Sequence, residues 1–171
     1  MLSVDDTSPE ALTERFQNAM AVLKGDALVA HGDVAARDMV IDLLRRHDIT
    51  HILAWDFSHI PVADLEAEVR NAGITITIPN THEERSADTM QWLGSAGAGL
   101  TGADAAIAAT GTLVLSTGTG KGRIPTVLPP IWISIVSSSH LFACIEDWVA
   151  QQRTLGMAAI HERANLAFVT G

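Results

Sequence analysis

In the first half of the chain, short apolar segments typical of strands alternate with segments of helical periodicity. The strand-like segments are Asp26–Ala30, His51–Trp55 and Ile74–Ile78, and the last alternates strictly between apolar and polar residues. Between them we predict a helix that Asp33 caps and a helix over Pro61–Ala72. Strands and helices that alternate with short connections favour right-handed crossovers and parallel pairing. The predicted fold class is therefore α/β with a mostly parallel sheet.

A helix over Pro9–Lys24, with Thr7 or Ser8 as its cap, precedes this alternation. The second half changes character and is rich in glycine, alanine and threonine. No repeat, low-complexity tract or linker divides the sequence, so we expect one domain over residues 1–171. The further predicted elements are helices over Arg85–Ser95 and His140–Leu155 and strands over Ala105–Thr110, Thr112–Ser116, Ile131–Val136 and Leu166–Val169.

The composition suits a globular protein with a substantial core. The 171 residues are 47% hydrophobic and 18% charged, which excludes disorder for most of the chain. The net charge of −9 argues against a general nucleic-acid binder, since such proteins need basic faces. The single cysteine, Cys144, excludes a disulfide framework, and its apolar neighbours favour a buried packing role. No signal peptide and no apolar run of about 20 residues is recognisable, so we expect a cytoplasmic protein without a membrane span.

Charge is distributed unevenly along the chain. Sixteen of the 20 acidic residues precede residue 89, and between Met90 and Ile145 the only acidic residue is Asp104. The same stretch contains two bases, Lys121 and Arg123, and is therefore slightly positive within an acidic chain. If the protein binds an anion, we expect the site to lie in this stretch.

The segment Ser116–Arg123 (STGTGKGR) has the strongest local signal for a ligand site. Its glycines, Gly118, Gly120 and Gly122, permit unusual backbone angles and close approach of backbone amides to a ligand. Together with the two cations Lys121 and Arg123, the amides and hydroxyls of this segment can form a nest for phosphate or carboxylate. The spacing matches neither a Walker loop nor a dinucleotide-binding fingerprint. A flexible surface turn explains the composition equally well.

Other polar residues have alternative interpretations. Asp104 can orient Arg123 or a substrate hydroxyl, although a role in the turn at residues 102–104 is favoured. Asp56 follows the predicted strand His51–Trp55, at the carboxyl end where open α/β sheets bind ligands. The seven histidines show no metal-binding spacing, so no metal site is expected.

Residues 99–136 read GLTGADAAIAATGTLVLSTGTGKGRIPTVLPPIWISIV. This run resembles the signature of the lactate-utilisation (LUD) domain, in particular the lactate utilisation protein C group, and the pattern of residues 9–78 fits the same domain. The resemblance implies a three-layer α/β fold similar to ribose-5-phosphate isomerase, glucosamine-6-phosphate deaminase and the CoA transferases. It also implies a part in the oxidation of L-lactate to pyruvate, together with two iron–sulfur partner proteins. By position, the motif indicates a pocket at Thr110, Gly111, Thr112, Gly118, Gly120 and Arg123.

The chain departs from the family pattern at three places. Ala109 stands where the family commonly has an acid, and Trp132 stands where it tends to have a histidine. Both departures remove a polar candidate for catalysis. The chain ends at Gly171, where resembling sequences continue into a further loop, so we expect the domain to lack that loop. No catalytic residue is therefore assigned.

Three hypotheses for function follow. The first is an accessory or ligand-binding subunit that supports lactate oxidation, with no cofactor of its own and with iron–sulfur clusters only in its partner proteins. The alternative is an enzyme that acts on a small phosphorylated, carboxylated or CoA-linked metabolite through residues 116–123. The third is an interaction module that pairs with a second copy or a partner through apolar surface. Trp92, Trp132 and Trp148 fit a core as easily as such an interface. For the first two, the candidate ligand-binding residues are Thr110, Gly111, Thr112, Ser116, Gly118, Gly120, Lys121, Arg123 and Asp104.

Overall fold

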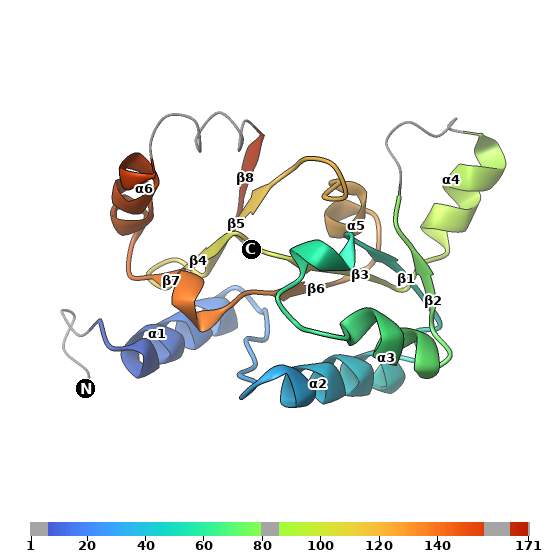
Figure 1. Ribbon diagram of the computed structural model, residues 1–171, viewed down its shortest axis with the longest axis horizontal. Coiled ribbons are helices and arrows are strands. Elements are labelled where there is room, and N and C mark those ends of the chain that lie inside the picture. Colours follow the sequence, from blue (N-terminus) through green and yellow to red (C-terminus); the bar gives the residue numbers. More distant parts are fainter. Residues whose placement is uncertain (1–6, 80–85, 156–164, 171) are drawn as a thin grey trace. The chain divides into compact units, whose positions relative to one another are not determined.

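The computed structural model describes residues 7–79, 86–155 and 165–170, and Figure 1 labels its elements. The chain divides into two compact units. The parallel-sheet unit consists of Ala30–Gly102 and Gly118–Ile135. The mixed-sheet unit consists of the chain up to Val29, Ala103–Thr117 and the chain from Val136 onward. Each unit contains one four-stranded sheet.

The parallel-sheet unit has helices around four parallel strands. Its elements are α2 (Asp33–Arg46), β1 (His51–Ala54), η1 (Phe57–His59), α3 (Leu65–Asn71), β2 (Thr75–Thr77), α4 (Ala87–Gly94), β3 (Ala98–Gly102), α5 (Ile124–Val127) and β6 (Ile131–Ile135). The strand order is β2-β1-β3-β6, with Ile52 beside Ala98 and Ala54 beside Leu100. Every residue of β1 and β3 is buried, which is typical of parallel strands covered on both faces. The predicted α/β class is confirmed.

Helix α5 packs directly on strand β3. A Cβ atom added at Gly99 would lie 1.7 Å from the carbonyl oxygen of Pro125, so no larger residue fits between the two elements. Because α5 begins directly after residue 123, this contact holds the end of the glycine-rich segment against the sheet.

The mixed-sheet unit combines parallel and antiparallel pairing. Its elements are α1 (Pro9–Val22), β4 (Ala105–Ile107), β5 (Thr112–Ser116), η2 (Ser138–His140), β7 (Leu141–Phe142), α6 (Ile145–Thr154) and β8 (Leu166–Val169). The strand order is β7-β4-β5-β8, in which only the β4–β7 pair is parallel. Ala105, Ile107, Val114 and Trp148 form its core. Ser8 caps α1 as predicted, and its Oγ accepts a hydrogen bond from the amide of Ala11 at 3.3 Å.

Three predicted elements in the first half differ from the structure. Asp26–Ala30 is not a strand, and the side chain of Gln17 donates to its carbonyl at Ala27 (2.9 Å). Helix α2 has Gly32 as its N-cap, so Asp33 is the first helical residue instead of the cap. Helix α3 begins four residues after Pro61, because Asp64 has a left-handed backbone (φ +57°) that a helix interior does not accept.

The predicted helix His140–Leu155 is wrong in its first part. Leu141 and Phe142 form strand β7, which pairs with Ala106 and Ile107 of β4, and α6 begins only afterwards. Cys144 lies at this junction and is half-buried instead of packed in the core. Its thiol donates to the carboxylate of Asp147 (3.2 Å). The backbone hydrogen bond at Asp147 lowers the pKa of the thiol, but the carboxylates of Asp147 and Glu146 outweigh it, so that the pKa is raised.

Candidate functional site

The glycine-rich segment forms a tight turn in the parallel-sheet unit. Gly118 and Lys121 exchange two backbone hydrogen bonds of 3.2 and 3.0 Å. Gly120, which has a positive φ, lets the backbone reverse within four residues. We call this turn and the residues that hold it, Trp55–His59 and Gly118–Arg123, the loop site.

Three carbonyl groups of the turn are bonded to the segment that follows β1. The amide of Asp56 donates to the carbonyl of Gly120 (2.8 Å), and the indole nitrogen of Trp55 donates to that of Gly122 (2.7 Å). The imidazole Nε2 of His59 donates to the carbonyl of Thr119 (3.2 Å). The glycine-rich turn is therefore anchored at the carboxyl end of β1, where parallel α/β sheets place their ligands.

The glycines of the turn have different structural roles. Gly120 has a φ of +73°, and a Cβ there would lie 2.8 Å from the Cβ of Asp56. Gly118 and Gly122 have no positive φ, and a Cβ at either would meet no heavy atom within 4 Å. Packing thus explains the glycine at 120. It does not explain the other two, which leave room beside the backbone.

Two cations belong to the loop site. The Nζ atom of Lys121 lies 5.5 Å from the centre of the Trp55 ring, within the range of a cation–π interaction. Arg123 is exposed directly before α5, and its carbonyl accepts from the amide (3.0 Å) and the hydroxyl (2.8 Å) of Thr126. The backbone of Arg123 is therefore fixed while its guanidinium lies at the surface.

The residues after β1 pack beneath the glycine-rich turn and against the end of β3. Asp56 lies where the sequence placed it, but its carboxylate accepts hydrogen bonds from the hydroxyl (2.6 Å) and amide (2.9 Å) of Ser58. These bonds lower the pKa of Asp56, first of all the bond from the hydroxyl. A Cβ at Gly102, the last residue of β3, would lie 2.3 Å from the carbonyl oxygen of His59, so η1 covers the end of β3. Sequence reasoning missed His59, because no spacing links it to residue 119.

The other candidate residues lie in the mixed-sheet unit. Asp104, between β3 and β4, accepts a hydrogen bond from the amide of Ser116 through its Oδ2 atom. Thr112 Oγ1 is 2.7 Å from both Thr110 Oγ1 and Thr170 Oγ1. Gly111 has a φ of +66° and closes the β4–β5 hairpin against α1. The structure thus divides the nine candidates: Gly118, Gly120, Lys121 and Arg123 belong to one unit, and Asp104, Thr110, Gly111, Thr112 and Ser116 to the other.

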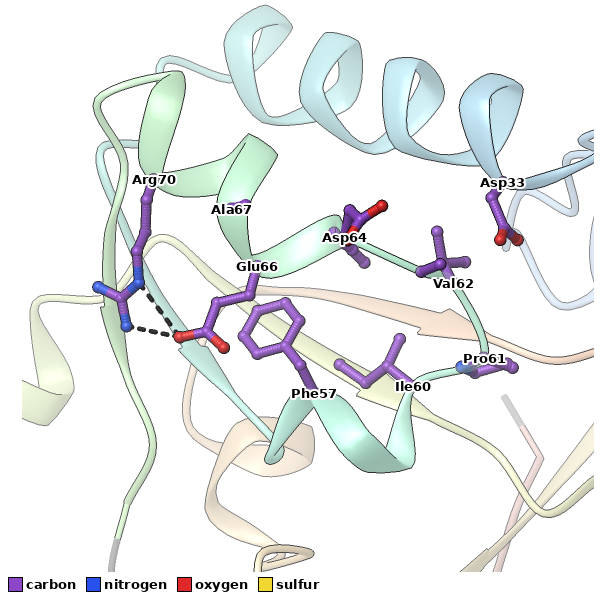
Figure 2. A pocket seen from close by; sticks show the side chains of 11 residues that line it. Asp33, Phe57, Ile60, Pro61, Val62, Asp64, Glu66, Ala67 and Arg70 are labelled. Carbon is purple, nitrogen blue, oxygen red and sulfur yellow. Dashed lines mark hydrogen bonds and ion pairs between the residues drawn. The ribbon is translucent and has the colours of Figure 1, made fainter.

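A hollow of about 720 Å³ also lies on the parallel-sheet unit and shares Phe57 with the loop site, and Figure 2 shows its lining. Phe57 and Ile60 provide apolar surface, and Glu66 forms an ion pair with Arg70 at 2.8 Å. Asp33 and Asp64 add two further carboxylates to the lining. The lining thus has more carboxylates than cations, which disfavours binding of an anion. The hollow is therefore not the slightly positive anion site that the sequence predicts.

Within residues 7–79, 86–155 and 165–170, no three His, Cys, Asp or Glu side chains gather as metal ligands. No helix in the part of the chain that the structure describes is long and apolar enough to cross a membrane.

A glycine-rich turn anchored at the carboxyl end of a parallel strand places the chain among the α/β proteins with a candidate ligand site at that edge. The LUD domain family model matches residues 13–171, and the chain therefore belongs to the LUD domain family. This confirms the resemblance identified in residues 99–136.

Two relatives extend the comparison. The chain is 26% identical over 141 residues to "Lactate utilization protein C" of Geobacillus sp. (strain WCH70), a match that covers 76% of this chain and 52% of that protein. The chain thus spans about half the length of this curated relative. A crystal structure of a DUF162 family protein from Deinococcus radiodurans has a similar fold, with a TM-score of 0.68 at 17% identity. That similarity covers 96% of this chain and 90% of the other.

Proposed function

We propose that this chain is a ligand-binding component of a lactate-utilisation system and that it binds a small carboxylate, such as lactate or pyruvate, at the loop site. The observation that carries the proposal is the anchoring of the turn at residues 118–122 by Trp55, Asp56 and His59. Membership of the LUD domain family and similarity to a lactate utilization protein C support the choice of system.

The chemistry of the loop site suits an anion. Its carbonyls at 119, 120 and 122 are bonded to the protein, which removes negative dipoles from the exposed side of the turn. Gly118 and Gly122 leave space beside the backbone, and Arg123 supplies an exposed guanidinium. A guanidinium pairs with a carboxylate through two parallel hydrogen bonds, so Arg123 is the residue expected to bind the ligand directly.

The proposed role is accessory and not catalytic. Asp56 carries the carboxylate of the loop site. That carboxylate accepts two hydrogen bonds from Ser58, which lower its pKa and favour the ionised form. A carboxylate with a lowered pKa is unprotonated near neutral pH, so it cannot donate a proton, and it is also a weaker base than an ordinary aspartate. Oxidation of lactate would accordingly take place on iron–sulfur partner proteins, with this chain binding substrate or product in the cytoplasm.

Calorimetric titration with L-lactate, pyruvate and inorganic phosphate tests the ligand. We expect saturable binding of a carboxylate, and we expect Arg123→Ala to weaken it at least tenfold. Arg45→Ala is the matched control, because Arg45 is also an exposed arginine but lies in the last turn of α2. Equal loss of binding in both variants, or no binding of either carboxylate, would contradict the proposal.

Co-purification tests the accessory role. The tagged chain, expressed in a host that carries the iron–sulfur proteins of such a system, should retain them through a salt wash. Turnover of a phosphorylated or CoA-linked metabolite by the purified chain alone would instead establish the enzymatic alternative.

A further inference from the structure

Helix α4 is attached to the edge of the parallel sheet through a buried histidine. His51, the first residue of β1, is 7% exposed, and its ring stacks on the indole of Trp92 with centroids 4.3 Å apart and planes 26° apart. Trp92 comes from α4 and is half-exposed, with 49% of its surface accessible. Figure 1 shows α4 beyond β2, the edge strand next to β1.

Four hydrogen bonds connect His51, Thr77, Ser95 and Trp92, and His51 takes part in two of them. The indole nitrogen of Trp92 donates to Thr77 Oγ1 (3.1 Å), which is 3.0 Å from His51 Nε2. On the other side of the ring, His51 Nδ1 is 3.1 Å from Ser95 Oγ. The Ser95 hydroxyl donates to the carbonyl of Trp92 (2.7 Å). The chain of bonds therefore begins and ends on Trp92.

These partners determine which nitrogen of His51 carries the proton. The Ser95 hydroxyl uses its hydrogen on the carbonyl of Trp92, so Ser95 Oγ can only accept from His51, and Nδ1 must be the protonated nitrogen. In the neutral ring Nε2 then has a lone pair, which accepts the hydrogen of the Thr77 hydroxyl. Every donor and acceptor in the network is satisfied when His51 is neutral.

A second proton on the ring does not fit this network. An Nε2–H would point at Thr77 Oγ1, and the Thr77 hydroxyl would lose the acceptor for its own hydrogen. The charge would also lie at a buried position, which is costly without an acidic partner. Protonation of Nε2 therefore removes the hydrogen bond that the Thr77 hydroxyl donates to His51. Thr77 is also the residue that accepts the hydrogen bond from Trp92 of α4.

We propose that His51 is a proton-sensitive attachment for α4, which holds the helix on the sheet while the imidazole is neutral and weakens that attachment when Nε2 is protonated. The inference is independent of the ligand proposed for the loop site. Leu93, which packs with Leu53 and Ala96, keeps an apolar contact between α4 and the sheet in both states. The response is thus a loosening of the helix and not unfolding of the unit.

Few charges surround the imidazole. The described parts of β2 and β3 carry no titratable side chain, and α4 carries only Asp88, which is exposed in its first turn. The connection before β1 adds His47 and Asp48, both exposed, and no ion pair links any described acid to His51. Burial is accordingly the cause that lowers the pKa of His51.

Amide hydrogen exchange of the full chain at pH 7.5 and 5.0 tests the proposal. After correction for intrinsic exchange rates, we expect the protection factors of the α4 amides to be lower at pH 5.0 than at pH 7.5. The largest possible decrease is about 30-fold, because an imidazole of pKa about 6.5 in the opened state gains a proton between these pH values. The amides of α2 serve as an internal reference. His51→Gln should abolish the pH response of α4, whereas His47→Gln, at an exposed histidine, should preserve it.

A measurement on the unmodified protein covers the case in which His51→Gln fails to fold. Nitrogen-15 chemical shifts of the labelled imidazole at pH 7.5 should show protonated Nδ1 and unprotonated Nε2. The opposite tautomer, or α4 protection that does not change between the two pH values, would overturn the proposal.

Discussion

At the scale of single residues, the three glycines of the loop site differ in whether the folded backbone requires them. Gly120 is needed by the protein itself, since its φ is +73° and Asp56 lies against it. Gly118 and Gly122 are not needed in this way. The same residue type in a repeating pattern therefore meets a backbone requirement at Gly120 but not at Gly118 or Gly122.

This difference predicts effects of different size on the free energy of unfolding. Gly120→Ala should lower the free energy of unfolding by at least about 1–2 kcal/mol, the cost of a left-handed conformation for an L-residue, because the Cβ contact with Asp56 adds to it. Gly118→Ala and Gly122→Ala should change it by less than about 0.5 kcal/mol. Urea denaturation of the three variants provides the measurement. Equal destabilisation by all three would show that the turn is tighter than described.

His51 makes a prediction about pH. Its pKa is lowered in the folded protein, so the unfolded chain binds more protons than the folded chain as the pH falls through the titration of a free imidazole. Its contribution to stability is complete above pH of about 6.5 and decreases below it, toward the folded pKa. The difference in urea-unfolding free energy between the native chain and His51→Gln should therefore shrink from pH 7.5 to pH 5.5. A difference that grows on acidification would contradict this sign.

At the scale of secondary structure, α6 presents its one buried aromatic ring to the mixed sheet. Trp148 is 4% exposed and meets Phe168 of β8 edge-to-face, with centroids 5.7 Å apart. Its indole N–H has no hydrogen-bond partner among the residues that the structure describes. The ring therefore contributes apolar area to the core, while its polar atom opposes burial.

Substitution of Trp148 separates these two contributions. Trp148→Phe should lower the free energy of unfolding by less than about 1.5 kcal/mol, because removal of the unpaired donor offsets part of the lost buried apolar area. Trp148→Ala should cost about 3–5 kcal/mol, since it leaves a cavity between α6 and the sheet. Thermal unfolding of both variants is the check, and similar losses for both would indicate that the indole nitrogen is satisfied.

Elements were predictable from sequence where local pattern decides them. The strands β1 and β5 and the helix α1 follow from apolar runs and from a serine cap. The predictions failed where contacts distant in sequence compete with local preference. Leu141 and Phe142 have helical spacing with the residues after them, yet pairing with β4 makes them a strand.

At the scale of the whole molecule, the chain divides into two compact units. Two such units can still unfold together as one domain, so the single domain expected over residues 1–171 stays a prediction. The family model covers both units, since it matches residues 13–171. The chain nevertheless spans 52% of its curated relative.

Ligand binding should appear as a change in global stability. A carboxylate present at 100 times its dissociation constant stabilises the folded chain by about 2.7 kcal/mol, which raises the Tm by roughly 5–11 °C for a protein of this size. Arg123→Ala should show no such increase at the same concentration. A rise of equal size in that variant would place the ligand elsewhere on the molecule.

The sequence by itself determined the α/β class, the family and the glycine-rich turn, because periodicity, motifs and glycine spacing are properties of neighbouring residues. Only the tertiary structure decided what holds that turn and what His51 contacts. Trp55 reaches a carbonyl 67 positions away, and His51 bonds to a serine 44 positions away. Such contacts depend on strand order and on which elements pack together, and no local pattern encodes them.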